Sequence, residues 1–554
     1  MPRPKLLCIG MDAMDSRLVL QWAKEGYLPT FARLLSSGFN AEIDTPSGVL
    51  EGAVWPTLIT GVSPAAHGIF SFLQLKPGSY ELRQGNRADR LAVPPFWFEL
   101  SKGGKRVAVV DAPMSRPIKG LNGIQVVNWG AHDAPSSWER CSWPPNLIND
   151  LVKKFGDHPV EGCDADGRSF SDYEDLRSRL IAAVEKKTDL LRYCLGLEEW
   201  DLFFGVYSES HCVGHQFWHL MDSSHPFHRL ETPEILQSAI RDVYRAIDKG
   251  LGTLLEYSPK DTGVLVLLSH GMGPFYTGSH LIDAVIERAG INPPIDLSPD
   301  AEENAVGHSL TPREMLWKSR HVLPPRVREY LKKVGPREML SRFWAWSHPP
   351  DWLGLRRMAG RWQNMRAFGV PTNYMTGAIR INLKGRDPNG MVSPGAEYND
   401  LCEHLGKVFL DLDNPATGRK AVQWVARACD FYNGPHLDEF PDLFIEWDHS
   451  AAISALFSPA IGEVYGVFQY SRTGSHMENS RLFGFGPAFR TGEIKEEIRA
   501  EDIPATILDI FGVPCPKMLD GRSMLPLLRR SKETYVRKNP VVNVSPHGEK
   551  LEVH

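Results

Sequence analysis

The feature that most constrains the fold of this chain is a series of short apolar runs separated by longer amphipathic stretches. The apolar runs predict buried strands, at residues 6–10, 107–110, 202–206, 264–268 and 482–486. The amphipathic stretches predict helices, at residues 18–25, 30–36, 172–196 and 233–256. Strands that alternate with helices are typical of βαβ units. We therefore expect an α/β protein whose central sheet is mostly parallel and is flanked by helices.

The composition argues against several classes of protein. The chain of 554 residues is 42% hydrophobic and 23% charged, which is typical of soluble globular proteins. Its formal net charge of -5 gives no general attraction to nucleic acid or to a membrane. No apolar run approaches the roughly 18 residues of a membrane span, and residues 6–10 are too short for a signal peptide. The cysteines include no CxxC pair, and we expect a cytoplasmic protein.

Two regions are predicted as additions to a core formed by residues 1–297 and 371–530. One is an insertion at about 131–195, and the other is a basic, tryptophan-rich helical insertion at 298–370. The second region has two interpretations: solvated helices whose tryptophans pack on the core, or a basic aromatic lid that attracts an anionic substrate or a membrane surface. The polar tail at 531–554 is predicted to be mobile.

Metal-binding side chains recur at the ends of the predicted strands. Asp12 follows the first strand, His211 and His215 follow the third, His270 follows the fourth, and His476 shortly precedes the last. Ligands of open α/β sheets bind beyond the carboxyl ends of the strands. A single histidine is more often a surface or hydrogen-bonded core residue. However, His211 and His215 are spaced to share one helix face, and two imidazoles placed this way suit zinc or iron.

Several ordered motifs resemble those of a known family, from residue 6 to about 527. They are IGMDA at 9–13, WPTLITG at 55–61, SPAAHGI at 63–69, SHGMG at 269–273, GAIRINL at 377–383, GPHLDEFPD at 434–442, DIPATILDIFGVP at 502–514 and DGR at 520–522. In this order they resemble the type I phosphodiesterase/nucleotide pyrophosphatase branch of the alkaline phosphatase superfamily. The resemblance implies an alkaline-phosphatase-like core with inserted helical cap regions.

The resemblance also implies a site for two metal ions, usually zinc, and a Thr or Ser nucleophile. Asp12, His215, His270 and His476 match metal ligands of the family. Three positions depart from its pattern. The nucleophile position holds Glu51, and two positions where the family has Asp hold His211 and Ser269.

The departures predict a remodelled site, because six competent metal ligands remain. The first metal position would be formed by His211, His215 and His476. The second would be formed by Asp12, Glu51 and His270, with Ser269 a poor ligand. Glu51 would act as a ligand or as a general base for water, since a carboxylate is a weak nucleophile toward a phosphodiester.

We therefore expect a metal-dependent hydrolase of phosphate esters, in the first place a phosphodiesterase, that uses metal-activated water. One or two divalent ions are expected, with zinc as the first choice and iron or manganese as alternatives. The expected partner is a small anionic phosphoester and not a nucleic acid, and nothing in the sequence fixes an oligomeric state. Glu209 is a candidate to support the ligands from behind, and Arg380 either meets substrate oxygens or has a structural role in a strand.

Two other functions compete with hydrolysis. The histidine-rich site suits a redox or lyase-type metalloenzyme on the same fold. The cleft and the basic insertion also suit a non-catalytic protein that binds an anionic ligand. Metal content, measured together with activity on a generic aryl phosphodiester, separates the three functions.

Overall fold

The computed structural model describes residues 5–46, 50–84, 91–130, 140–160, 168–293, 360–372, 375–466 and 472–529. Most of the predicted tryptophan-rich insertion, residues 298–359, lies outside these ranges, as does the predicted tail at 531–554. None of the helices in these ranges is long and apolar enough to cross a bilayer.

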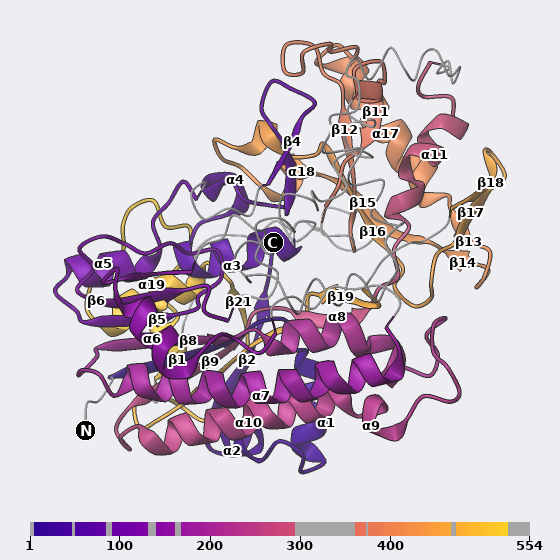
Figure 1. Cartoon of the computed structure of the whole chain (residues 1–554). Coiled ribbons are helices and arrows are strands. Elements are labelled where there is room, and N and C mark those ends of the chain that lie inside the picture. The colour runs from indigo at the N-terminus through magenta and orange to yellow at the C-terminus, as the bar shows by residue number, and fades with distance from the viewer. Residues whose placement is uncertain are drawn as a thin grey trace, which may run out of the picture.

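A nine-stranded sheet forms the centre of the larger lobe (Figure 1). In spatial order its strands are β21 (Gly492–Arg499), β2 (Phe39–Asp44), β20 (Ser480–Phe485), β9 (Gly263–Leu268), β1 (Leu6–Met11), β8 (Leu202–Tyr207), β5 (Val107–Val110), β6 (Gly123–Val127) and β7 (Cys141–Trp143). Neighbouring strands pair in parallel except where β20 and β7 take part. The predicted α/β class with a mostly parallel sheet is confirmed.

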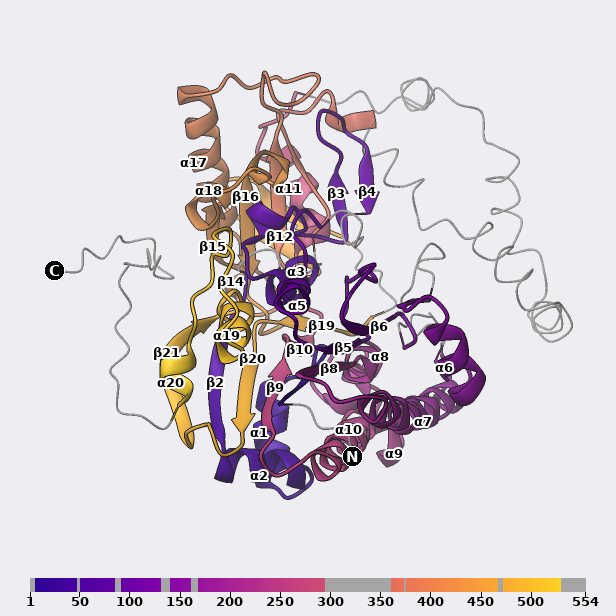
Figure 2. The ribbon, with the colours of Figure 1, turned by 90° about the vertical axis from the view of Figure 1, so that its left-hand side faces the viewer.

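Both faces of this sheet are buried because helices cover each of them (Figure 2). Side chains alternate along β1, so that Leu7 and Ile9 enter one core while Leu6 and Cys8 enter the other. The first face is covered by α1 (Ser16–Lys24), α2 (Pro29–Ser37), α7 (Phe170–Leu195), α8 (Glu209–Met221) and α10 (Ala239–Tyr257). The second face is covered by α3 (Leu50–Thr60), α5 (Phe96–Lys102), α19 (Asp502–Ile510) and α20 (Leu525–Leu528).

The described parts of the predicted insertion at about 131–195, residues 140–160 and 168–195, pack on the large sheet and its core. Strand β7 extends the edge of the sheet, and α7 packs against α10. Leu180 and Val184 of α7 are fully buried in the same core as β1. The helix was predicted correctly, but its amphipathic pattern does not say which surface its apolar face covers.

The smaller lobe has its own sheet and core, and lies above the large sheet in Figure 1. Its antiparallel sheet has the order β11 (Ala367–Gly369), β12 (Gly377–Ile381), β16 (Leu443–Trp447) and β15 (Val422–Arg427). Helices α11 (Ile282–Arg288) and α17 (Ala396–Leu410) pack on it. A further small sheet contains β14 (Arg419–Lys420), β13 (Asp413–Asn414), β17 (Ala455–Ser458) and β18 (Gly462–Tyr465).

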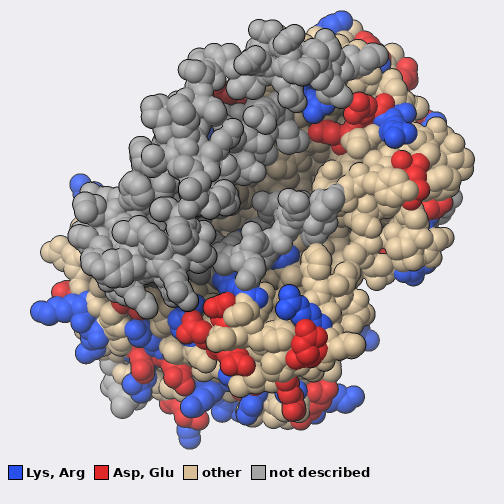
Figure 3. Space-filling model, turned by 45° about the vertical axis from the view of Figure 1, so that its right-hand side comes forward, with Lys and Arg blue, Asp and Glu red and all other residues tan. Residues whose placement is uncertain are grey.

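The end of the predicted tryptophan-rich insertion belongs to this smaller lobe. Trp362 is fully buried and stacks on Phe368 of β11, with ring centroids 4.8 Å apart. This tryptophan therefore packs on the smaller lobe. Between the two lobes the surface is hollowed (Figure 3).

Candidate metal centre

Three neighbouring parallel strands bring candidate ligands to one edge of the large sheet. Strand β1 lies between β8 and β9, and its last residue, Met11, is level with the last residues of both neighbours. Asp12 follows β1, helix α8 begins two residues after β8, and His270 lies two residues after β9. The carboxyl ends of these strands therefore gather at the position where α/β proteins bind their ligands.

Two glycines allow the last histidine to join this edge. His476 lies on β19 (Gly474–Met477), which pairs with β10 (Gly271–Pro274) and packs against α8. A Cβ atom at Gly474 would lie 2.2 Å from the carbonyl oxygen of Gly214, so only glycine permits this approach of strand and helix. The backbone N–H of Thr473 also donates to the carbonyl of His215 at 2.9 Å.

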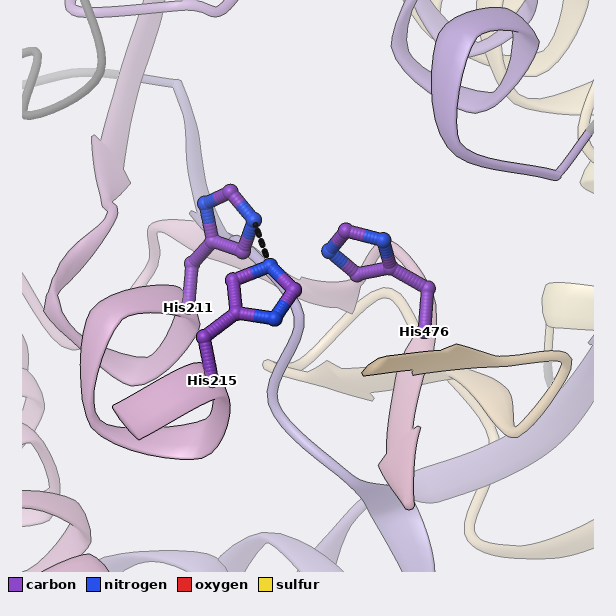
Figure 4. Close-up of side chains that lie close together, drawn as sticks. All are labelled: His211, His215 and His476. Atoms are coloured by element: carbon purple, nitrogen blue, oxygen red, sulfur yellow. Dashed lines mark hydrogen bonds between the residues drawn. The ribbon is translucent and has the colours of Figure 1, made fainter. Parts of the chain in front are cut away.

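The resulting cluster consists of three imidazoles that face one another (Figure 4). One ring nitrogen from each of His211, His215 and His476 lies within 4.8 Å of the others. The Nε2 atoms of His211 and His215 are 2.8 Å apart, and His215 and His476 are buried. Of the three histidines of α8, His211 and His215 lie on the face of the helix that meets His476.

The residues around the cluster fit a bound divalent metal. Tetrahedral zinc with Zn–N distances of about 2.0–2.1 Å separates ligand nitrogens by about 3.3 Å, so small side-chain movements complete such a site. Nδ1 of His215 donates to the carbonyl of Gly474 at 2.7 Å, and Nδ1 of His211 lies 3.4 Å from Oδ2 of Asp12. Metal-binding histidines commonly direct their other ring nitrogen to a carbonyl or a carboxylate in this way.

The neighbouring half of the site has a different character, because an indole and a hydroxyl bond its carboxylate and its imidazole. The indole Nε1 of Trp55 donates to Oδ1 of Asp12 at 2.7 Å. Oγ of Ser269 lies 3.0 Å from Nδ1 of His270 and 3.5 Å from the same Asp12 oxygen. Ser269 also accepts the backbone N–H of Ala13 at 3.3 Å.

His270 is buried at the border between the two halves. Its ring centroid lies 4.5 Å from that of His476, and its Nε2 is 4.0 Å from Oδ1 of Asp12. Among the residues that the structure describes, this Nε2 has no hydrogen-bond partner. Burial, with a further contribution from His476, holds the pKa of His270 well below its ordinary value, so the ring is neutral near pH 7.

Glu51 lies in the first turn of α3, and the placement of its side chain is outside what the structure describes. Trp55 follows one helical turn later, on the same side of the helix, and it is the residue of α3 that reaches Asp12. The sequence-based interpretation placed Trp55 in a motif but gave it no role. Its spacing of four residues from Glu51 could have indicated that Trp55 lies on the side of the helix that faces the site.

Glu209 supports the start of α8 and contacts none of the three histidines of the cluster in the hydrogen bonds seen here. Its carboxylate accepts the backbone N–H of Ser208 and bonds Nε2 of His158, both at 3.0 Å. Burial favours the neutral acid, but the bond to His158 and the charge of Lys187 outweigh burial and lower the pKa of Glu209.

Arg380 lies in the smaller lobe, away from the histidine cluster. Its guanidinium donates to Asp387 at 2.9 Å and to the carbonyls of Asp438 and Phe440. These contacts favour the structural alternative for Arg380.

Nothing in the sequence indicated a role for Arg472, although its Nη1 lies 3.2 Å from Nε2 of His215. It lies four residues before His476, and no strand or helix pattern marks its position.

Similar solved structures cover most of the chain. A search of curated proteins finds no match. Among solved structures, phosphonoacetate hydrolase from Sinorhizobium meliloti bound to phosphonoformate has a TM-score of 0.45 and 14% identity, covering 91% of this chain and 94% of that chain. Murine ectonucleotide pyrophosphatase/phosphodiesterase 5 has a TM-score of 0.44 and 12% identity, covering 94% and 99%.

The family comparison is decisive. Residues 6–340 match the family described as type I phosphodiesterase/nucleotide pyrophosphatase. This match covers more than half of the chain and supports a phosphodiesterase- or pyrophosphatase-type hydrolase of the alkaline phosphatase superfamily. The chain belongs to the type I phosphodiesterase/nucleotide pyrophosphatase family.

Proposed function

We propose that this protein is a metal-dependent hydrolase of phosphate esters, in the first place a phosphodiesterase, in which water attacks phosphorus without a Thr or Ser intermediate. The observation that carries the proposal is the convergence of His211, His215 and His476 beside Asp12 at the carboxyl edge of the sheet. Family membership supplies the reaction class, and the cluster supplies a place for the metal.

In this proposal one ion is held tightly by the three histidines, and Asp12 orients His211 from behind. The ion supplies Lewis acidity toward a phosphoryl oxygen and lowers the pKa of water from about 15.7 to about 7. Zinc is the first choice because its preferred geometry matches three imidazoles with an open fourth position. Iron and manganese are the alternatives.

We assign Glu51 as the general base that accepts a proton from the attacking water. Direct attack by its carboxylate would produce a labile acyl phosphate, and a carboxylate is a far weaker nucleophile than an alkoxide. A base needs only to lie within hydrogen-bond reach of the water. The start of α3 is a suitable place, since Trp55 of the same helix contacts Asp12.

We assign Asp12, Ser269 and His270 mainly to positioning. Trp55 and Ser269 hold one oxygen of Asp12, which fixes the orientation of its other oxygen toward His211. His270 is neutral, and its Nε2 has no hydrogen-bond partner among the described residues, so this nitrogen can donate to a phosphoryl oxygen without repelling a nearby cation.

Metal content and hydrolysis of bis(p-nitrophenyl) phosphate, measured on the same preparations, test the proposal. The wild type is expected to contain metal and to hydrolyse the ester, whereas His476→Ala loses both. His404→Ala is the matched control, because His404 is an exposed histidine of α17. Firmly bound metal without turnover of any phosphate ester would contradict the hydrolase, and metal-free wild type would favour a non-catalytic binding protein.

The substitution Glu51→Thr tests the assignment of the base. If Glu51 is the base, we expect turnover by water attack to fall while the metal content stays unchanged, since the three histidines are intact. Loss of both activity and metal would instead show that Glu51 is a ligand. Increased activity with a covalent phospho-enzyme would show that Glu51 blocks a nucleophilic path.

A further inference from the structure

Arg472 makes an unusual contact, because its cation donates to an atom that is needed for binding a metal. Its Nη1 lies 3.2 Å from Nε2 of His215. Nδ1 of the same ring faces the carbonyl of Gly474 at 2.7 Å, and a carbonyl can only accept a hydrogen bond. The proton of the neutral ring is therefore on Nδ1, and Nε2 carries a single lone pair. Two groups face this lone pair, Nε2 of His211 at 2.8 Å and Nη1 of Arg472 at 3.2 Å, and Arg472 is the one that carries a permanent positive charge.

This lone pair cannot serve Arg472 and a metal ion at the same time. Binding of an ion by His215 requires the guanidinium to leave Nε2, and its charge then remains close to the ion. The next residue limits how far Arg472 can withdraw. Thr473 is fixed on both sides, because its N–H donates to His215 and its carbonyl accepts from Phe275, each at 2.9 Å.

Two neighbouring cations are stabilised when an anion lies between them. A phosphoryl group has non-bridging oxygens on one tetrahedral centre, so one oxygen can face the ion while another accepts N–H groups of the guanidinium. The side chain of Arg472 is only partly buried, which leaves it accessible to a ligand that enters from solvent.

We propose that Arg472 is a phosphoryl clamp that exchanges His215 for a non-bridging oxygen of the substrate when the metal site is filled. This inference rests on the proposed function and deepens it, because it defines the substrate as an ester whose phosphoryl group keeps at least one anionic oxygen. In the metal-free protein the same arginine competes with the ion for His215. Loss of Arg472 therefore has opposite effects on the two ligands.

The test compares Arg472→Met, which removes the charge and the donors, with Arg472→Lys, which keeps the charge. Zinc affinity is measured by competition with a chelator, and affinity of the zinc-loaded protein for inorganic phosphate by calorimetry. For Arg472→Met we expect zinc to bind about tenfold more tightly and phosphate about ten- to a hundredfold more weakly. For Arg472→Lys we expect a smaller loss of phosphate affinity and zinc affinity near that of the wild type.

Arg168→Met is the matched control. Arg168 donates to Gln216, the residue that follows His215 on α8, so the variant removes an equal charge beside the same helix. We expect both affinities of this variant to match those of the wild type. If Arg168→Met reproduces the opposite changes, a general charge effect explains them and the clamp is wrong.

The outcomes separate the clamp from the proposed function. If Arg472→Met binds phosphate as tightly as the wild type does, and the wild type hydrolyses the ester, the clamp is wrong. The proposed hydrolase function is not affected by that result. Weaker zinc and weaker phosphate binding together show a structural role for Arg472 and also overturn the clamp. The predicted opposite shifts in a protein that hydrolyses no ester support the clamp and contradict the hydrolase. A wild type that binds no zinc overturns both.

Discussion

The two halves of the candidate metal centre differ in how their polar atoms are used. In the half formed by His211, His215 and His476, ring nitrogens face a common point, and the outward nitrogen of His215 is held by a carbonyl. In the half formed by Asp12, Ser269 and His270, an indole and a hydroxyl already bond the carboxylate and the imidazole. These contacts lead us to propose different tasks for similar residue types at one edge of one sheet.

This difference follows the departures from the family pattern. At the two positions where the resemblance leads us to expect Asp, His211 would add a third imidazole to one half, and Ser269 would leave the other half without a carboxylate. Ser269 bonds its neighbours but is a poor metal ligand. The comparison leads us to place the single firmly bound ion in the histidine half and to give the other half a positioning role.

The largest expected effect separates the two halves directly. His215→Ala should reduce kcat/KM for an aryl phosphodiester by at least about a thousandfold, because loss of the ion removes its activation of water. His270→Ala should reduce it by only about tenfold to a hundredfold, as expected for a residue outside the ligand set. Steady-state kinetics of both variants measure the ratio, and equal losses would remove the distinction between the halves.

A smaller effect is expected from the indole that holds Asp12. Trp55→Phe keeps the ring but removes the donor to Oδ1, so Asp12 orients His211 less firmly. We expect metal affinity to fall by about tenfold or somewhat more, at the lower end of the effects seen when residues behind the ligands are changed. Metal competition titrations measure it.

Trp97→Phe is the control for that substitution. Trp97 is fully buried, and within the described part of the chain its indole nitrogen has no hydrogen-bond partner. Metal affinity of Trp97→Phe should remain at the wild-type value. If both tryptophan variants weaken metal binding equally, packing of the ring and not the bond to Asp12 is the cause.

Placing a carboxylate at position 269 should enable the half that contains Asp12 and His270 to bind a metal ion, as the histidine half is proposed to do. Ser269→Asp places an acidic group beside Asp12 and His270, and we expect a second zinc ion to bind about tenfold more tightly than in the wild type. Ser269→Asn has a similar size without the charge and should leave the second ion weak. Calorimetric zinc titrations distinguish the variants, and unchanged second-ion affinity in Ser269→Asp would count against the positioning role.

The smallest effect concerns the support of α3 by His67. Its Nε2 bonds Thr57 at 3.0 Å, and burial, with a minor contribution from His436, lowers the pKa of His67 to about 3. Below the unfolded pKa of about 6.5 the unfolded chain binds a proton that the native ring does not, so stability falls as pH falls toward about 3.

Between pH 6 and pH 5 this residue should cost the metal-free protein about 1 kcal/mol of unfolding free energy. In His67→Gln the unfolding free energy should fall less between pH 6 and pH 5, because this contribution is absent. Urea titrations at the two pH values measure the difference. Because His67 supports α3 and thus Trp55, acid should weaken the Asp12 half before the histidine half. Identical slopes for the two proteins would contradict the assigned cause.

Much of the large lobe could be predicted because its strands are short apolar runs that end at chemically informative residues. Asp12 and His270 were placed at one edge on this basis, and the HxxxH spacing placed His211 and His215 on one face of α8. Partner choice over long distances could not be predicted. The pairing of β12 with β16 and the packing of α7 on the main core depend on surfaces that periodicity does not identify.

The same limit explains what was missed in the site. The bond from Trp55 to Asp12 depends on how closely α3 approaches the end of β1, and the contact of Arg472 with His215 depends on the approach of β19 to α8. Both approaches are set by packing, including the glycine pair Gly214 and Gly474. Residue type and spacing alone do not encode such distances.

The number of zinc ions per chain, measured by elemental analysis after gel filtration, tests the central difference between the halves most directly. The wild type, His270→Ala and His215→Ala are compared under the same conditions. We expect about one ion in the wild type, about one in His270→Ala and none in His215→Ala. Two ions in the wild type, or an ion that is lost from His270→Ala and kept by His215→Ala, would contradict it.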